Sequence, residues 1–269
     1  MTGNVLTAYI GNLAAALLFM TAVWLLSLKQ RNASIVDSFW GPGFIFLTGL
    51  TAAFGSALGG RQTLLLALTL VWGLRLSLHI TWRNWGQEED RRYQVWRAKY
   101  GPSFWWQSLL RIFWLQGLLL WVIALALQTA ILNPEPVQIT WADRLGTLIW
   151  LIGFTFEAAA DWQLARFKSD PANRGRVMDQ GVWRYSRHPN YFGETLIWWG
   201  IFVIALANLE NWWTIISPLT ITYLLLKVSG VTLQEKDLPE RRPAYRAYQE
   251  RTNAFIPWFP RAGKTSEPL

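Results

Sequence analysis

Long uncharged stretches alternate with short connections along this chain. Residues 2–28, 38–60 and 112–134 carry no charged side chain, and each stretch exceeds the roughly 20 apolar residues that a helix needs to cross a bilayer core. We therefore expect an all-α fold, an integral membrane bundle and not a soluble globular domain. The pattern predicts seven transmembrane helices, at about 6–28, 39–59, 62–81, 109–132, 144–163, 190–208 and 211–230.

Lysine and arginine residues fall mainly on one side of the predicted membrane. Twenty of the 25 lie on that side, and only Arg61 and Arg144 lie in the opposite connections. Because cytoplasmic loops carry the excess of cations, we expect the N-terminus outside and the C-terminus in the cytoplasm. The first span has no cationic leader, so we interpret it as a retained helix. The cation-rich segments are 29–38, 82–108, 164–187 and 231–269.

Composition excludes several classes of function. The chain has no Cys and only two His, so zinc sites built from these ligands, disulfides and thiol chemistry are excluded, and we expect no metal. The net charge of +8 follows the membrane rule and not a groove-binding stripe, so we expect membrane lipids as partners and no nucleic acid. No glycine-rich phosphate-binding motif occurs. A nucleotide cofactor would therefore be held by the helices themselves.

No internal repeat or low-complexity tract divides the chain. We expect a single transmembrane domain over residues 1–264 and a disordered tail at 265–269. Two cytoplasmic segments, 88–100 and 240–251, have the pattern of amphipathic helices that lie at the membrane interface.

Polar side chains spaced at i, i+4 occur in three predicted spans, each time near the cytoplasmic end. Ionisable side chains are costly in a bilayer and are therefore functional candidates. Two interpretations stay open: a buried ion network that packs the bundle, or a site for a hydroxyl-rich ligand between the carboxylates. The six converging residues are Arg75, His79, Glu157, Asp161, Asn190 and Glu194.

The sixth span is predicted to begin at Pro189, because proline suits the first helical position and pushes the preceding residue out of a helix. The free N–H groups of that helix would then face the cytoplasm beside Arg184, Arg187 and His188, an arrangement that suits phosphate. The alternative is a helix start in an aromatic interfacial belt. That alternative does not explain why Asn190 and Glu194 share one inward face.

These residues carry a resemblance to a known superfamily. The stretch 181–194, with Arg-His-Pro-Asn-Tyr-Phe-Gly-Glu at its end, resembles the steroid 5-alpha-reductase C-terminal superfamily. Three further stretches, 34–41, 72–79 and 252–258, are similar to its bacterial branch of integral membrane proteins. The resemblance implies a multi-pass protein of the bacterial inner membrane. A similar Arg-His-Pro motif occurs in sterol reductases, isoprenylcysteine carboxyl methyltransferases and phospholipid methyltransferases.

The resemblance implies that residues 136–264 bind NADPH from the cytoplasm, while residues 1–135 face a hydrophobic substrate from the bilayer. It places Asn190 and Glu194 at the nicotinamide half and Asp161 at the adenosine end. Arginine and lysine side chains would meet the phosphates, and the tail tyrosines would close over the cofactor. The implied cofactor contacts are Arg75, His79, Glu157, Asp161, Arg166, Lys168, Tyr185, Arg187, His188, Asn190, Tyr191, Glu194, Tyr245 and Tyr248.

The implied reaction is hydride transfer from NADPH to a conjugated C=C bond of a steroid-like or isoprenoid-like lipid, assisted by a proton donor. The reductases use a Gln-Glu pair in the second helix and a Tyr in the third, and this chain has neither. Its nearest acid is Asp37, which is our catalytic candidate if burial raises its pKa; a helix N-cap is the alternative role. Trp72 stands where the Tyr would be, and we expect Trp40 and Trp72 to line the substrate pocket.

Two other functions stay open. One is an S-adenosylmethionine-dependent methyltransferase of the isoprenylcysteine type, and the other is a non-catalytic membrane protein. The density of cytoplasmic cations favours NADPH, which carries three phosphates, over S-adenosylmethionine, which carries none.

Overall fold

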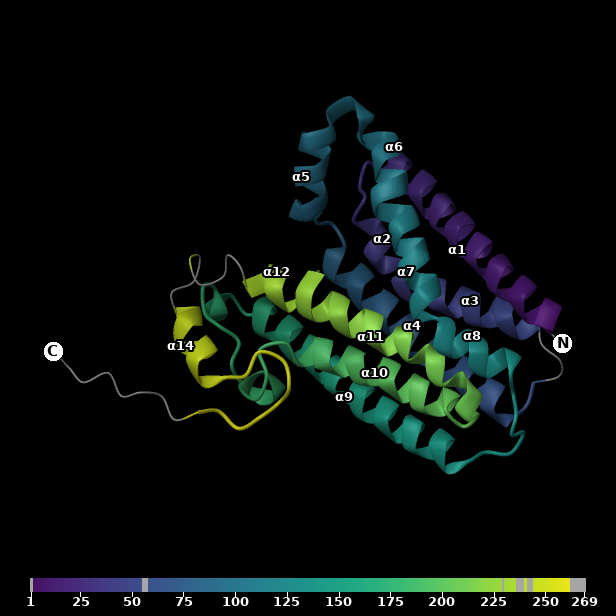
Figure 1. Ribbon diagram of the computed structural model, residues 1–269. Coiled ribbons are helices and arrows are strands. Elements are labelled where there is room, and N and C mark those ends of the chain that lie inside the picture. Colours follow the sequence, from purple (N-terminus) through teal and green to yellow (C-terminus); the bar gives the residue numbers. More distant parts are fainter. Residues whose placement is uncertain (1, 55–57, 229, 236–239, 241–243, 262–269) are drawn as a thin grey trace. The chain divides into compact units, whose positions relative to one another are not determined.

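The computed structural model describes residues 2–54, 58–228, 230–235, 240 and 244–261 (Figure 1). These residues form helices and connecting loops and include no strand. They group into two compact units. The first comprises Met1–Arg144 and Ile201–Ser217, and the second comprises Leu145–Gly200 and Pro218–Leu269.

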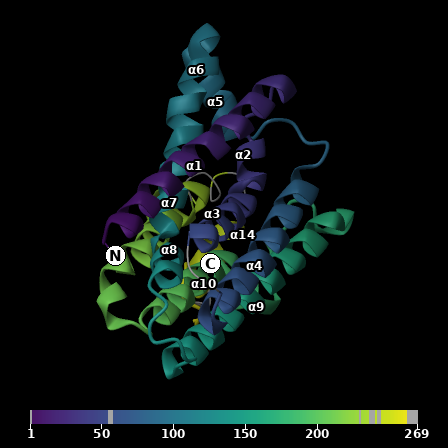
Figure 2. The same cartoon turned by 90° about the vertical axis from the view of Figure 1, so that its right-hand side faces the viewer.

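The first unit is built around the contact of two apolar helices, α3 (Trp40–Phe54) and α4 (Gly60–Asn84), which pack along each other (Figure 2). Gly41 and Gly73 make the approach close, because a Cβ atom at Gly41 would lie 2.2 Å from the carbonyl oxygen of Gly73. Small residues at such positions allow membrane helices to approach closely. The other helices of the unit are α1 (Thr2–Gln30), α2 (Ile35–Ser38), α5 (Arg91–Tyr100), η1 (Gly101–Ser103), α6 (Phe104–Ser108), η2 (Leu109–Trp114), α7 (Leu115–Ile123), α8 (Leu125–Leu132) and η5 (Leu209–Ile215).

Buried polar side chains in the first unit pair with one another between helices, some through neutral hydrogen bonds and some through an ion pair. The Asn12 amide donates to Thr51 Oγ1 at 2.8 Å and to Gln128 Oε1 at 2.9 Å, so it connects α1, α3 and α8. A buried ion pair joins Arg61 to Asp143 at 2.7 Å. Such bonds replace the water that apolar surroundings exclude.

The second unit is built on α9 (Trp141–Ser169) and α10 (Pro189–Ala205). Glycines bring the two helices together: a Cβ atom at Gly193 would lie 2.5 Å from the Glu157 backbone nitrogen, and one at Gly200 would lie 2.6 Å from the Gly146 carbonyl oxygen. This seam fixes the start of α10 beside Glu157. The remaining elements that lie wholly or partly in this unit are η3 (Pro171–Asn173), η4 (Gly181–Arg184), α11 (Ile216–Tyr223), η6 (Leu224–Val228), α12 (Val231–Glu235) and α14 (Ala244–Arg251).

The predicted all-helical fold is confirmed, and helices occupy every predicted span. The fourth span is interrupted at Ala124, and the seventh consists of η5, α11 and η6. Within the described residues, three helical stretches are long and apolar enough to cross a membrane: Val5–Gln30, Gly60–Asn84 and Arg91–Ile123. The count of seven spans and the orientation of the termini stay predictions.

The two predicted interfacial segments contain helices, α5 within 88–100 and α14 within 240–251. The predicted tail at 265–269 lies outside the described residues. The single transmembrane domain with its halves at 1–135 and 136–264 stays a prediction.

Candidate functional site

The helix α10 begins at Pro189, as the sequence predicts. The residues that precede it are anchored to neighbouring segments of the second unit. The indole N–H of Trp183 donates to the Ala160 carbonyl at 3.0 Å, and the Tyr248 hydroxyl donates to the carbonyls of Trp183 and Ser186. Both aromatic side chains are buried. The start of α10 is therefore held by α9 on one side and by α14 on the other.

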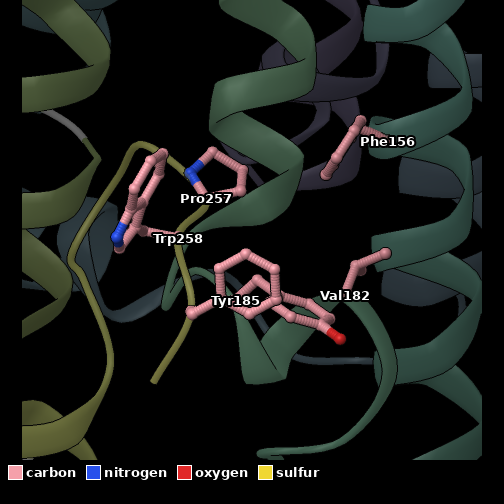
Figure 3. A pocket seen from close by; sticks show the side chains of 6 residues that line it. Phe156, Val182, Tyr185, Pro257 and Trp258 are labelled. Carbon is pink, nitrogen blue, oxygen red and sulfur yellow. The ribbon is translucent and has the colours of Figure 1, made fainter. Parts of the chain in front are cut away.

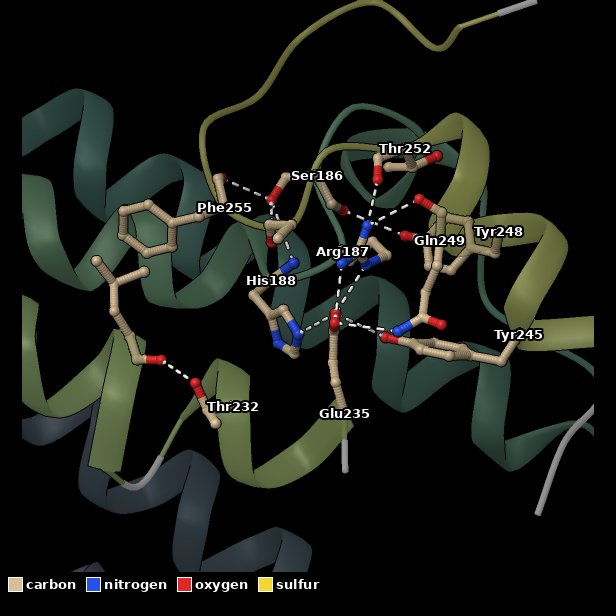
Figure 4. Close-up of polar contacts among 12 residues, drawn as sticks. Ser186, Arg187, His188, Thr232, Glu235, Tyr245, Tyr248, Gln249, Thr252 and Phe255 are labelled. Atoms are coloured by element: carbon tan, nitrogen blue, oxygen red, sulfur yellow. Dashed lines mark hydrogen bonds and ion pairs between the residues drawn. The ribbon is translucent and has the colours of Figure 1, made fainter. Parts of the chain in front are cut away.

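Glu235 lies at the centre of a polar cluster beside this helix start (Figure 4). One carboxylate oxygen accepts from Arg187 Nε at 2.7 Å, from His188 Nε2 at 3.0 Å and from the Tyr245 hydroxyl at 3.2 Å. The other accepts from an Arg187 terminal nitrogen at 2.8 Å and from Gln249 Nε2 at 3.2 Å. We call these five residues the Glu235 cluster. Its carboxylate has five donors.

The other terminal nitrogen of Arg187 donates to the carbonyls of Gln249 and Thr252. Its backbone N–H donates to the Asn253 carbonyl at 2.9 Å, and the Ser186 hydroxyl donates to the Phe255 carbonyl at 2.7 Å. Residues 186–187 and 249–255 are thus fastened together. Closure of the tail tyrosines over a cofactor stays a prediction.

The charge of the cluster follows from these contacts. Burial disfavours ionisation of Glu235, but the hydrogen bonds from His188 and Arg187 outweigh it and hold the pKa of the carboxyl well below its ordinary value. Burial and the nearby Glu235 charge raise the pKa of the Tyr245 hydroxyl. The carboxylate is therefore ionised and the phenol is neutral near pH 7.

A second group of polar residues lies between α9 and α10. Glu157 is 2% exposed and Asp161 9%, and the Asn190 amide donates to Asp161 Oδ1 at 3.4 Å. The amide oxygen of Asn190 is buried and has no hydrogen-bond partner. Gly193 lies against the Glu157 backbone. The structure thus brings together residues from two of the three predicted pairs, and Glu194 follows Asn190 one turn later on α10.

An apolar cleft of about 390 Å³ opens beside Tyr185 (Figure 3). The loop that follows α14 forms one wall, and it is fixed by the bond from the Trp258 backbone N–H to the Tyr185 carbonyl at 2.9 Å. The lining residues are Phe156, Val182, Tyr185, Pro257, Trp258 and Phe259.

Of the other predicted cofactor residues, one contacts the Glu235 cluster and the rest lie elsewhere on α9 and α4. Tyr191 stacks on His188 with ring centroids 5.5 Å apart. Arg166 lies over the Trp162 ring at 5.5 Å, and Lys168 is exposed near the end of α9. Arg75 and His79 lie on α4 in the first unit. Their predicted convergence with residues of α9 and α10 would join the two units and stays a prediction.

Asp37 has two side-chain partners on α5 that neither interpretation of the sequence anticipated. Arg92 donates to Asp37 Oδ2 at 2.9 Å, and the buried Tyr93 hydroxyl donates to Oδ1 at 3.0 Å. Burial raises the pKa of the Asp37 carboxyl, although Arg92 and Tyr93 both act to lower it. A raised pKa is the condition that a role as proton donor requires.

The two tryptophans predicted to line the substrate pocket are close to one another in the first unit. Phe44 contacts both, with ring centroids 5.4 Å from Trp40 and 5.6 Å from Trp72. Trp72 is completely buried. The pair belongs to the aromatic packing between α3 and α4.

Sequence reasoning missed Glu235, Gln249 and Tyr93. Tyr93 lies in the amphipathic segment 88–100, and Gln249 follows Tyr248 directly, so both are next to features that the pattern had marked. Glu235 lies beyond the last apolar span among other charged residues. Nothing in its local pattern separates it from an ordinary solvent-facing acid.

The length and apolar composition of three helical stretches among the described residues indicate a membrane protein. The family model described as "Protein of unknown function (DUF1295)" matches residues 23–252, and the chain belongs to this family, which is steroid 5-alpha-reductase-like. The bacterial branch stays a prediction.

The chain is also similar to the uncharacterized protein C594.04c of Schizosaccharomyces pombe, with 26% identity over 93% of this chain and 79% of the fungal protein. No solved structure matches the chain significantly. Within the part of the chain that the structure describes, no group of three or more His, Asp or Glu side chains could hold a metal ion.

Proposed function

We propose that this protein is a membrane-embedded, NADPH-dependent reductase that transfers a hydride to a conjugated C=C bond of a hydrophobic lipid. Two lines support the proposal. The family is steroid 5-alpha-reductase-like, and the second unit offers hydrogen-bonding groups that match a nicotinamide nucleotide. The observation that carries the proposal is the buried amide oxygen of Asn190, which has no partner.

The residues present fit the cofactor. A nicotinamide carboxamide has N–H donors for the Asn190 oxygen, and ribose hydroxyls are donors for the carboxylates of Glu157 and Asp161. A buried acceptor without a partner costs roughly 1 to 3 kcal/mol, which a ligand N–H would recover. Tyr185 would present the wall of the apolar cleft to a flat ring. NADPH, when bound, would supply the hydride.

While Glu235 occupies Arg187, the phosphates would be met by other cations. The Arg187 guanidinium already donates to Glu235 and to two backbone carbonyls. Arg166, Lys168 and Arg184 are exposed near the ends of α9 and η4, where they could reach a diphosphate. The sequence counts Arg187 among the cations available to the phosphates of NADPH, but with Glu235 bound to it Arg187 no longer counts.

On the substrate side, Asp37 would be the proton donor. In reduction of an enone the β carbon receives the hydride, and the enolate then takes a proton, which leaves Asp37 as a carboxylate. Arg92 is placed to stabilise that carboxylate, since its terminal nitrogen lies 2.9 Å from Asp37 Oδ2. Tyr93 would hold the orientation of the carboxyl group.

A methyltransferase that uses S-adenosylmethionine is the second candidate, and one observation favours it. The guanidinium of Arg187 is neutralised by Glu235, so the start of α10 is less cationic than its sequence predicts. A cofactor without phosphates would tolerate such a site.

Titration of the purified full-length protein with NADPH and with S-adenosylmethionine tests the proposal. We expect NADPH to bind, and we expect Asn190→Ala to weaken it about tenfold through loss of one buried hydrogen bond. Asn84→Ala, a substitution at the end of α4 in the first unit, is the matched control. Selective binding of S-adenosylmethionine would establish the second candidate, and binding of neither would refute both.

A further inference from the structure

The four donor residues of the Glu235 cluster form the kind of site that binds a phosphate. An arginine fork that contacts two oxygens of one anion is the usual geometry for carboxylate and phosphate recognition. His188, Tyr245 and Gln249 add three further donors to the same two oxygens. In this structure, the anion is the carboxylate of Glu235.

The donors and the carboxylate come from different segments. Arg187 and His188 precede α10, Tyr245 and Gln249 lie on α14, and Glu235 ends the five-residue helix α12. The site is largely enclosed, with the side chains of Arg187 and His188 11% and 3% exposed. Without the carboxylate, the largely buried guanidinium would keep its two backbone carbonyl acceptors but would have no counter-ion, and the other three side chains would lose their acceptor. Such an arrangement requires an anion.

We propose that the Glu235 cluster is a phosphate-binding site that the chain fills with its own carboxylate. The phosphate of a nucleotide cofactor would enter by displacing Glu235, so α12 would act as an internal competitor of that ligand. The proposal rests on the proposed function in one respect, namely that the incoming phosphate belongs to the cofactor.

The competition predicts that removal of the carboxylate strengthens phosphate binding. We would titrate the full-length protein with inorganic pyrophosphate by calorimetry and compare wild type with Glu235→Ala and Glu235→Gln. Both substitutions should tighten binding about tenfold or more, because the ligand no longer competes with an internal anion. Glu250→Gln, at an exposed glutamate on α14, should bind as wild type does.

A double variant tests whether the gain comes from this site. Arg187→Gln combined with Glu235→Gln should lose the gain, because the fork that holds the anion is absent. Equal affinity of wild type and a folded Glu235→Gln, or a gain that survives loss of Arg187, would overturn the proposal. Unfolding temperatures show which variants fold, and Glu235→Gln carries the test if Glu235→Ala does not.

Titration with further ligands shows whether the phosphate comes from the cofactor or from a lipid. It also distinguishes failure of this inference from failure of the reductase proposal. NADPH should gain affinity in Glu235→Gln together with pyrophosphate. A gain for nanodiscs that contain phosphatidic acid, without one for NADPH, would overturn the assignment to the cofactor. If NADPH binds all variants equally, this inference fails while the reductase proposal stands. If no variant binds NADPH but pyrophosphate gains, the reductase proposal fails and the phosphate site stands.

Discussion

Asp37 in the first unit and Glu235 in the second are both carboxyl groups held by an arginine and a tyrosine hydroxyl, yet their proton affinities shift in opposite directions. Asp37 accepts hydrogen bonds from Arg92 and Tyr93, and Glu235 accepts them from Arg187 and Tyr245. Glu235 has two more donor residues, His188 and Gln249.

At both groups burial and the hydrogen-bond donors act in opposite directions on the pKa, and the balance differs. With two donors, burial prevails and the pKa of Asp37 is raised; with five donor contacts, burial is overcome and the pKa of Glu235 is lowered. A raised pKa is what the proposed role of Asp37 as a proton donor requires. Glu235 stays ionised near pH 7 and is suited to hold the donors around it in place until another anion displaces it.

The largest loss of stability is expected when Glu235 loses its ion pair with Arg187. Arg187→Gln would leave a mostly buried carboxylate without its ion pair and two carbonyls without donors. We expect a loss of about 3 kcal/mol in the free energy of unfolding, measured by denaturant unfolding in detergent. Arg184→Gln, at an exposed neighbour, should change stability little; equal losses in both would contradict the structural importance of the cluster.

Glu235→Gln should show how the stabilisation depends on pH. A lowered folded-state pKa stabilises the protein above the ordinary value of 4.5, and this contribution is lost as the pH falls below that value. We expect wild type to exceed the variant by about 1.5 kcal/mol at pH 7. Unfolding measured from pH 7 to pH 3 should show the difference shrinking; a constant difference would mean that the charge is not responsible.

Asp37→Asn should show the opposite dependence on pH. Since burial raises the pKa of Asp37 in the folded state, its ionisation costs stability as the pH rises through the folded pKa. Wild type should therefore gain stability relative to the variant when the pH is lowered. The same unfolding series measures this, and parallel pH dependence for Asp37→Asn and Glu235→Gln would refute the comparison.

The smallest effect is expected from Tyr93→Phe, which removes one neutral donor from Asp37. We expect a loss of about 1 kcal/mol in stability and a further rise in the Asp37 pKa. Infrared difference spectra of the protonated carboxyl band, recorded against pH with Asp37→Asn as the blank, follow that titration. A fall in the pKa would show that Tyr93 favours the protonated form.

The sequence predicted the positions of the helices because each is a long apolar run, and it predicted the start of α10 because Pro189 restricts its neighbours. It also predicted that Asn190 would lie near Asp161, since the spacing places both near one end of their helices. The break at Ala124 has no such signal, because no proline or glycine marks it.

The two carboxyl clusters could not be predicted in the same way. Glu235 lies 48 positions from Arg187, and Asp37 lies 55 positions from Arg92, so each pairing depends on how loops return to the helices. Local patterns indicate that a residue is charged or that a segment is amphipathic. They do not indicate which charge a distant loop will meet.

Transfer of an isotopic label tests the central proposal most directly. The full-length protein would be incubated with NADPH deuterated at both C4 positions and with its co-purified lipid fraction, and the lipids examined by mass spectrometry. The proposed reductase predicts one deuterium bound to carbon in a reduced lipid, and less of this product from Asn190→Ala at an NADPH concentration that does not saturate the variant. Appearance of a deuterated methyl group from labelled S-adenosylmethionine, with no deuterium from NADPH, would contradict it.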